Sequence, residues 1–230
     1  MKILILLPVT MLMSAVALLS IPFERKGKLF RLMALWWSQF ILWIFGIEIS
    51  TKFIEDLDLS KSYVFVANHA SMFDIPAVIV ALRGKINLVF KKELARIPLW
   101  GWTLKFGHFI MIDRSNPVNA MKSLERAANS IREGNSIILF PEGTRTRDGK
   151  LQPFKRGAFS LAISSKVPVV PVTINGTYKI LPRGSIKINP SKISVIVERP
   201  INTEKFSGKE GELELMRKAY AVIEKYYVDQ

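Results

Sequence analysis

Cysteine is absent from this 230-residue chain, and histidine occurs only twice, as His69 and His108. Without cysteine there can be no thiol nucleophile, disulfide bond or thiolate metal site, which is consistent with a reducing compartment. Two histidines are too few for a multi-histidine zinc site. We therefore expect no metal cofactor, and any imidazole chemistry depends on one of these two residues.

Several common catalytic motifs are also missing. No GxSxG turn occurs, which disfavours a serine hydrolase of the α/β type. Neither GxxxxGK[ST] nor GxGxxG occurs, so nucleoside triphosphate and dinucleotide sites lack support. Acidic residues are few, with 19 Asp and Glu against 33 Lys and Arg, a net charge of +14. Such an excess favours a polyanionic partner, which charge alone leaves open among nucleic acid, an anionic bilayer and phosphorylated substrates.

The first 47 residues have the composition of a membrane segment. Residues 3–21 are nearly all apolar and uncharged, and as a helix they would reach about 28 Å, close to the thickness of a bilayer core. A basic cluster follows, made of Arg25, Lys26, Lys28 and Arg31. A second apolar stretch, residues 32–47, contains three of the five tryptophans, a residue that prefers the bilayer interface. The pattern predicts a membrane-embedded pair of helices.

Two other interpretations of this region are weaker. A cleaved signal peptide would need a more basic start than Lys2 alone and a small-residue cleavage site before the charged cluster. A buried core hairpin conflicts with the lack of any polar face in the first segment. The positive-inside rule keeps the basic loop in the cytoplasm, and the second stretch, roughly 24 Å as a helix, is short for a span. We therefore expect a monotopic helix pair in the cell membrane, with the rest of the chain on the cytoplasmic face.

Residues 48–230 form a second unit that alternates strands and helices. Apolar runs predict strands at residues 48–54, 63–67, 86–90, 109–112, 136–140, 169–174 and 193–197. Helices are expected at residues 76–82, from Pro117 to Gly134, and at residues 212–228. This alternation indicates an α/β domain with a mixed or largely parallel sheet flanked by helices.

A candidate base and carboxylate follow the strand at residues 63–67. His69 and Asp74 are separated by four residues, and a carboxylate can fix the tautomer of an imidazole that takes up a proton. On a regular helix the two side chains would point about 140° apart. Pro76 disfavours helical geometry at Ile75, so the segment is predicted to be a strand-to-helix turn on which they converge. In the alternative interpretation, Asp74 caps a helix and His69 is an ordinary loop residue.

Two more loops contain arginine at a strand end. The segment from Phe140 to Arg145 follows another buried strand, and its arginine and glycine-flanked amides could hold an anion, although a surface turn is an equal alternative. The segment 107–114 ends a strand with Asp113 and Arg114. His108 has no acid neighbour in the sequence and is interpreted as structural.

Taken in order, NHASMFD (residues 68–74), GHFIMIDR (107–114), FPEGTR (140–145) and VPVVPV (167–172) resemble the four sequence blocks of the glycerolipid acyltransferase family. The resemblance is nearest to the bacterial type of its 1-acylglycerol-3-phosphate acyltransferase branch. It implies that His69 is the general base toward the free sn-2 hydroxyl of lysophosphatidate and that Asp74 orients it. It also implies direct attack on acyl-coenzyme A or acyl-carrier protein, giving phosphatidic acid in phospholipid biosynthesis.

The same resemblance implies roles for substrate-binding residues. Arg114 and Arg145 would hold the acceptor phosphate, and Glu142, Gly143 and Thr144 would shape the acceptor site. The acyl thioester is a co-substrate, so no cofactor is expected, and an anionic bilayer is the expected partner. Two rival hypotheses are another acceptor, such as glycerol 3-phosphate or another lysophospholipid, and a membrane-tethered protein that binds anionic lipid or nucleic acid. No nucleic-acid-binding motif is visible, so we expect no nucleic-acid partner.

Overall fold

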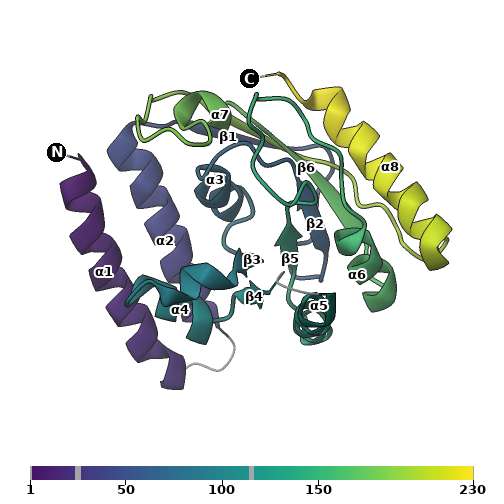
Figure 1. The fold of residues 1–230 in the computed structure, drawn as a ribbon, viewed down its shortest axis with the longest axis horizontal. Coiled ribbons are helices and arrows are strands. Elements are labelled where there is room, and N and C mark those ends of the chain that lie inside the picture. Colours follow the sequence, from purple (N-terminus) through teal and green to yellow (C-terminus); the bar gives the residue numbers. More distant parts are fainter. Residues whose placement is uncertain (1, 24–26, 114–116, 230) are drawn as a thin grey trace.

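The computed structural model describes residues 2–23, 27–113 and 117–229 (Figure 1). Its strands are β1 (Ile49–Phe53), β2 (Val64–Ala67), β3 (Asn87–Lys91), β4 (Ile110–Ile112), β5 (Ile137–Leu139), β6 (Val169–Asn175) and β7 (Ile193–Val197). Its helices are α1 (Lys2–Ser20), α2 (Lys28–Phe45), α3 (Asp74–Ala81), α4 (Trp100–Phe106), α5 (Pro117–Arg132), α6 (Gly157–Ser165), α7 (Thr177–Ile180) and α8 (Gly208–Tyr226). Short 3-10 helices cover Ile21–Phe23 and Lys92–Arg96.

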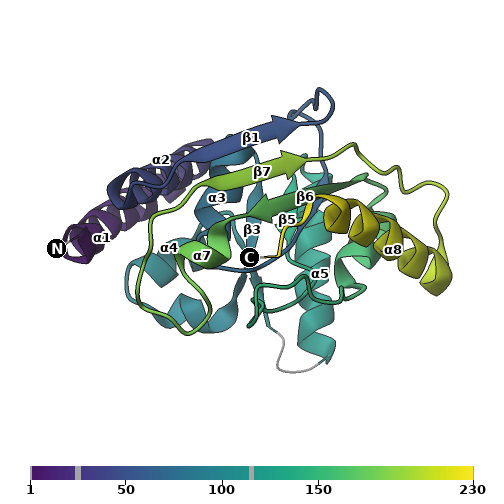
Figure 2. The same ribbon diagram turned by 90° about the horizontal axis from the view of Figure 1, so that it is seen from above.

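All the strands form one seven-stranded sheet in the order β1-β7-β6-β2-β5-β3-β4. Figure 2 shows β1, β7 and β6 side by side at one end of this sheet. Every neighbouring pair is parallel except β6 and β7. Strand β2 lies near the middle, with β5 on one side and β6 on the other. The carboxyl ends of these three strands therefore meet at one edge of the sheet, and the fold class predicted from the sequence is confirmed.

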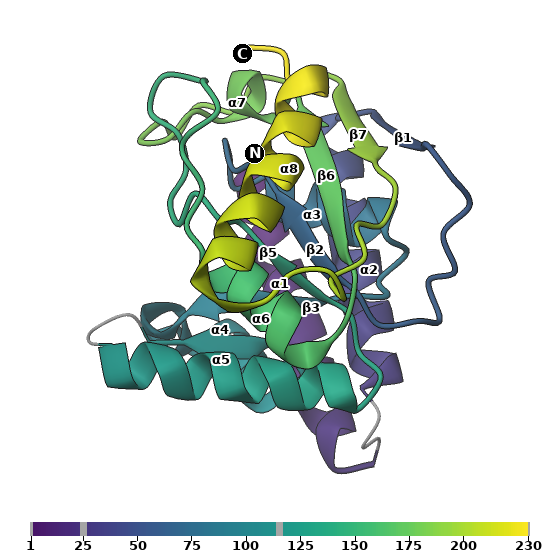
Figure 3. The same ribbon diagram turned by 90° about the vertical axis from the view of Figure 1, so that its right-hand side faces the viewer.

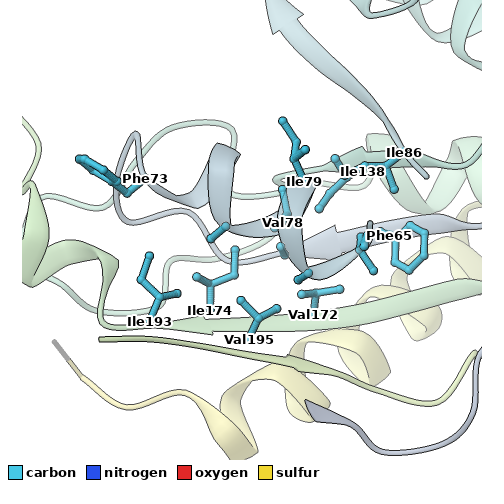
Figure 4. Close-up of a cluster of buried hydrophobic side chains, with 14 of the residues drawn as sticks. Phe65, Phe73, Val78, Ile79, Ile86, Ile138, Val172, Ile174, Ile193 and Val195 are labelled. Atoms are coloured by element: carbon cyan, nitrogen blue, oxygen red, sulfur yellow. The ribbon is translucent and has the colours of Figure 1, made fainter. Parts of the chain in front are cut away.

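Helices cover both faces of the sheet, so its central strands are buried on both sides. In β2, Phe65 and Ala67 face one apolar cluster, which includes side chains of α2 and α3. Figure 4 shows Phe65 in this cluster together with Val78 and Ile79 of α3. Val64 and Val66 face the other cluster, beneath α5, α6 and α8 (Figure 3). Burial on both faces explains why these strands are continuous apolar runs rather than alternating ones.

The two N-terminal helices differ in how they are buried. Among the described residues, one helix is long and apolar enough to cross a membrane, Leu4–Phe23, with a mean hydropathy of 2.4 and only 11% of that stretch buried. Helix α2 buries one side, including Ile41, Leu42 and Phe45, in the cluster shared with α3. The Trp37 side chain joins the two helices, because its Nε1 donates to Thr10 Oγ1 over 3.0 Å. The division into units 1–47 and 48–230 stays a prediction.

The predicted strands lie within a residue or two of those observed, whereas the helices differ more. Helix α3 begins at Asp74, so Ile75 is helical, contrary to our expectation. Pro76 is tolerated there because the N–H groups of a first helical turn have no partner within the helix. Helix α8 begins at Gly208, four residues before the predicted start. Helices α4, α6 and α7 were not predicted.

Candidate active site

The turn between β2 and α3 brings His69 and Asp74 together. His69 Nδ1 lies 2.7 Å from Asp74 Oδ2, and the Asp74 side chain is fully buried. The same carboxylate oxygen accepts hydrogen bonds from the backbone N–H groups of Ala70 (2.7 Å) and Ser71 (2.8 Å). Because an ionised carboxylate can only accept, Nδ1 of the neutral imidazole is the donor and Nε2 keeps its lone pair. The His69 side chain is 18% exposed, so a substrate can reach it.

Two polar side chains fix this turn to the rest of the sheet. The Asn68 amide donates to the Ile174 carbonyl (2.8 Å) and accepts from the Ile174 N–H (2.7 Å), so it pairs with β6 as a short strand would. Ser71 Oγ donates to the Leu181 carbonyl over 2.9 Å, just after α7. His69 is therefore held by contacts with residues more than one hundred positions away.

Glu142 lies beneath His69. The His69 N–H donates to Glu142 Oε1 over 2.6 Å, and the Glu142 side chain is 4% exposed. The His69 carbonyl accepts from the Thr146 N–H over 2.9 Å. The Phe140 ring stacks on the imidazole with 4.2 Å between centroids. Because β5 lies directly beside β2 in parallel register, the turns that follow the two strands are neighbours and contact each other.

Burial dominates the electrostatics of Glu142. Loss of hydration raises the pKa of this carboxyl from 4.5 to about 8, and the charge of Asp74 adds to the rise, while the His69 N–H opposes it. Glu142 Oε2 is buried and has no hydrogen-bond partner among the described residues. At neutral pH the carboxyl is therefore largely protonated. Within the described part of the chain, no three His, Asp or Glu side chains converge as a metal-binding group.

The remaining predicted residues lie in or beside the turn after β5. Gly143 has a φ of +79°, and its N–H donates to the Phe140 carbonyl over 3.0 Å. A Cβ atom at Gly143 would lie 3.0 Å from Lys155 Nζ, the end of a flexible side chain that can move aside, so it is the left-handed conformation that favours glycine here. Thr144 is exposed and Arg145 is half-buried. Arg114 lies outside the described residues, so the pairing of two arginines on one phosphate stays a prediction.

Two functional features have no counterpart in the sequence analysis. One is the hydrogen bond between the His69 N–H and Glu142, whose predicted part in shaping the acceptor site stays a prediction. The position of Glu142 directly after a buried strand could have indicated this contact. To use that indication, one must also know that β5 and β2 are neighbours in the sheet. The other is the stacking of Phe140 on His69, for which the same adjacency would have been the signal.

An apolar cavity of about 90 Å³ adjoins the turn that holds His69 and Asp74. Ile75, the residue after Asp74, lies in its wall, and nearly all of the lining surface is apolar. The cavity lies between helices α1, α2, α3 and α4, strand β3 and the residue before β4. Its lining residues are Met13, Ser14, Ala17, Phe30, Met33, Ala34, Trp37, Ile75, Ile79, Leu88, Trp100, Thr103, Leu104 and Phe109. An aliphatic chain is the kind of group that such a cavity can hold.

Comparison with known proteins gives consistent matches. A family model described as "Acyltransferase" matches residues 48–175. A 1-acyl-sn-glycerol-3-phosphate acyltransferase of Limnanthes douglasii is 41% identical over 166 residues, covering 71% of this chain and 58% of that protein. One from Haemophilus influenzae is 34% identical over 136 residues, covering 59% of this chain and 57% of that protein.

A crystal structure supports the same fold. The 1-acyl-sn-glycerophosphate (LPA) acyltransferase PlsC of Thermotoga maritima superimposes with a TM-score of 0.77 at 24% identity, covering 98% of this chain and 95% of that one. At this identity the likeness shows the fold alone. The chain spans a little over half the length of the curated relatives it matches, between 52% and 58% for the first three.

Proposed function

Because this chain belongs to the acyltransferase family, we propose that it transfers a fatty acyl group from acyl-coenzyme A or acyl-carrier protein to the free sn-2 hydroxyl of 1-acylglycerol 3-phosphate. The product is phosphatidic acid. The names of the relatives from Limnanthes and Haemophilus support this acceptor. The observation that carries the proposal is the 2.7 Å contact between His69 and a fully buried Asp74, at the carboxyl end of a central parallel strand.

The His69–Asp74 pair suits general-base chemistry. With Nδ1 donating to Asp74, Nε2 accepts the proton of the acceptor hydroxyl as its oxygen forms an ester bond with the acyl carbonyl carbon. The C–S bond of the thioester then breaks, and the leaving thiolate takes the proton from the imidazolium. Asp74 stabilises the imidazolium between these steps. The absence of cysteine agrees with direct transfer without a thiol-bound acyl intermediate.

The turn after β5 supplies positive charge beside this base. Arg145 and Arg147 lie on it, Lys155 approaches Gly143, and the only acid among residues 143–192 is Asp148. Asp148 is held within its own turn by Thr146 Oγ1 and the Lys150 N–H. This segment therefore offers a phosphomonoester several cations and one carboxylate, and a guanidinium fork matches the phosphate oxygens. We assign acceptor-phosphate binding to Arg145, together with Arg114.

The apolar cavity supplies room for an acyl chain. Its wall begins at Ile75, directly after the residue that orients the base, and continues between α1 and α2. A chain seated there would present its carbonyl or glycerol end to His69. The acyl thioester acts as a co-substrate, and no resident cofactor is part of the proposal.

We also propose that the protein is monotopic in the cell membrane, with its α/β domain on the cytoplasmic face. Helix α1 is apolar and largely exposed, whereas α2 packs on the domain, with the rings of Phe45 and Phe73 5.8 Å apart. A helix bound in this way cannot cross a bilayer independently. The basic residues at the start of α2, which include Lys28 and Arg31, favour the cytoplasmic side.

The decisive experiment compares His69→Ala with His108→Ala in detergent-purified protein. The two residues are the only histidines, and His108 packs near Phe30 with 6.0 Å between ring centroids, away from the pair. Lysophosphatidate and palmitoyl-coenzyme A are supplied, and thiol release is followed together with phosphatidate. A thiol reagent gives no protein background, because the chain has no cysteine.

We expect turnover in wild type and in His108→Ala, and none in His69→Ala. Parallel reactions with acyl-carrier protein, glycerol 3-phosphate and other lysophospholipids identify the donor and the acceptor. Full activity in His69→Ala would refute the base assignment. A wild type that is inactive with every acceptor and both donors would refute the acyltransferase function.

A further inference from the structure

Helix α4 has one exposed face of unusual composition for a surface helix. Trp102, Lys105 and Phe106 are all exposed, with exposures of 45% and 58% for the two aromatic residues. Their spacing places them on one side of the helix. Lys105 Nζ lies 5.1 Å from the centroid of the Phe106 ring. Just before the helix, Arg96 and Ile97 are exposed as well.

This face continues the exposed apolar surface of α1. Thr103 Oγ1, on the buried side of α4, donates to the Ser14 carbonyl of α1 over 3.2 Å. Figure 1 shows α4 beside the lower part of α1, with α8 on the opposite side of the molecule. Near this contact, Leu12, Val16 and Leu19 of α1 are exposed. The two helices are therefore neighbours, and each has an exposed apolar side.

The composition of the α4 face indicates which partner it fits. Tryptophan and phenylalanine beside lysine and arginine are typical of the boundary between acyl chains and anionic headgroups. A lysine side chain there can bury its methylene groups and keep its ammonium among phosphates. Among the described residues, neither Arg96 nor Lys105 has an ion-pair partner within the chain. An anionic bilayer complements both the apolar and the basic parts of the face.

We propose that α4 is a second membrane-contacting element, which inserts Trp102 and Phe106 into the headgroup region of an anionic bilayer beside α1. The proposal rests on the membrane placement in the proposed function and extends it to a helix of the α/β domain. The opposite side of α4, with Trp100 and Leu104, lines the apolar cavity. Helix α4 is then the partition between bilayer and cavity, and it holds the cavity at the level where lipid substrates lie.

Single-cysteine labelling tests this placement, because the chain has no native cysteine. Lys105→Cys reports on α4, and Lys209→Cys is the matched control, an exposed lysine on α8. Leu12→Cys reports on α1, where the side chain is 66% exposed. Each variant of the full chain is labelled with an environment-sensitive fluorophore and bound to vesicles of phosphatidylethanolamine and phosphatidylglycerol. Quenching is measured with aqueous iodide and with doxyl-labelled lipid.

We expect vesicles to lower the iodide quenching constant several-fold at positions 105 and 12 and to leave it unchanged at 209. Doxyl lipid should quench the first two labels only. If position 105 behaves like 209 while position 12 is protected, the role of α4 is refuted and the placement of α1 stands. If neither 12 nor 105 is protected, the membrane placement itself fails. Protection at 105 that needs no vesicles and grows with protein concentration would instead indicate contact between copies of the chain.

Discussion

Replacing Glu142 with glutamine tests whether the group beneath the catalytic base acts as a neutral acceptor. In the structure this carboxyl has a pKa of about 8, and one of its oxygens accepts the His69 N–H over 2.6 Å. A glutamine carbonyl can accept the same hydrogen bond, and its amide has the shape of the protonated carboxyl. We therefore expect Glu142→Gln to keep most of the wild-type activity at neutral pH.

The matched substitution Glu142→Ala removes the acceptor. It leaves the buried His69 N–H without a partner, which costs about 1–3 kcal/mol. If this cost falls on the position of the base, turnover decreases by roughly tenfold to a hundredfold. Thiol release by wild type and both variants, with KM and kcat determined separately, measures the effect. The decrease should be in kcat, since Glu142 lies under the base and is almost completely buried.

The pH dependence of stability gives a second readout. Because the folded-state pKa of Glu142 is raised from 4.5 to about 8, the folded protein binds a proton there that the unfolded chain has released. The stability linked to this group is complete below pH 4.5 and is lost as pH rises toward 8, by at most about 1.4 kcal/mol per pH unit. Wild-type Tm should thus fall relative to Glu142→Gln over this window. A glutamine variant as inactive as the alanine variant, with an unchanged pH dependence of Tm, would refute the reasoning.

Three further substitutions test the site and its surroundings. Asp74→Asn keeps the shape of the side chain but removes the charge that stabilises the imidazolium, so kcat should fall by about 10²–10⁴ while KM changes little, as steady-state kinetics would show. Asn68→Ala removes the two hydrogen bonds to Ile174, and a thermal melt should show a loss of about 2–3 kcal/mol. Ala17→Phe fills part of the apolar cavity, so the preference measured in a competition between palmitoyl and lauroyl donors should shift toward the shorter chain. An unchanged preference would show that the acyl chain of the donor does not bind in the cavity.

The sheet could be predicted from the sequence because burial on both faces leaves a clear signal. Val64 to Ala67 form an uninterrupted apolar run, since alternate side chains enter two different clusters. Helix α6 was not predicted for a related reason. Ala158, Phe159, Leu161 and Ala162 are all buried, and the polar residues of the helix are only serines, so the contrast between its sides that produces helical periodicity is weak. Helix α4 has only seven residues, too few for a periodic pattern.

The catalytic pair was predictable because its two members lie on one turn. A local turn of the backbone is enough to bring His69 and Asp74 together. The motif and its position at the end of a strand predicted such a turn. Glu142 required a contact across 73 residues. A glutamate in a segment rich in glycine and arginine is normally expected to be exposed to solvent. No local sequence pattern indicates that Glu142 is buried. The sequence therefore predicted the loop that contains Glu142, but not the contact of Glu142 with His69.

The long-range anchors of the catalytic turn determine when activity can arise during synthesis. Domains form from the N-terminal side as the chain emerges from the ribosome. Helix α1 precedes His69 in the chain, whereas His69 needs Glu142 from the turn after β5, and Asn68 needs Ile174 from β6. A nascent chain can thus reach the bilayer long before its base is in place. If α1 binds lipid as proposed, we expect a chain stalled before β6 to be bound to lipid while the turn that holds His69 is still incomplete.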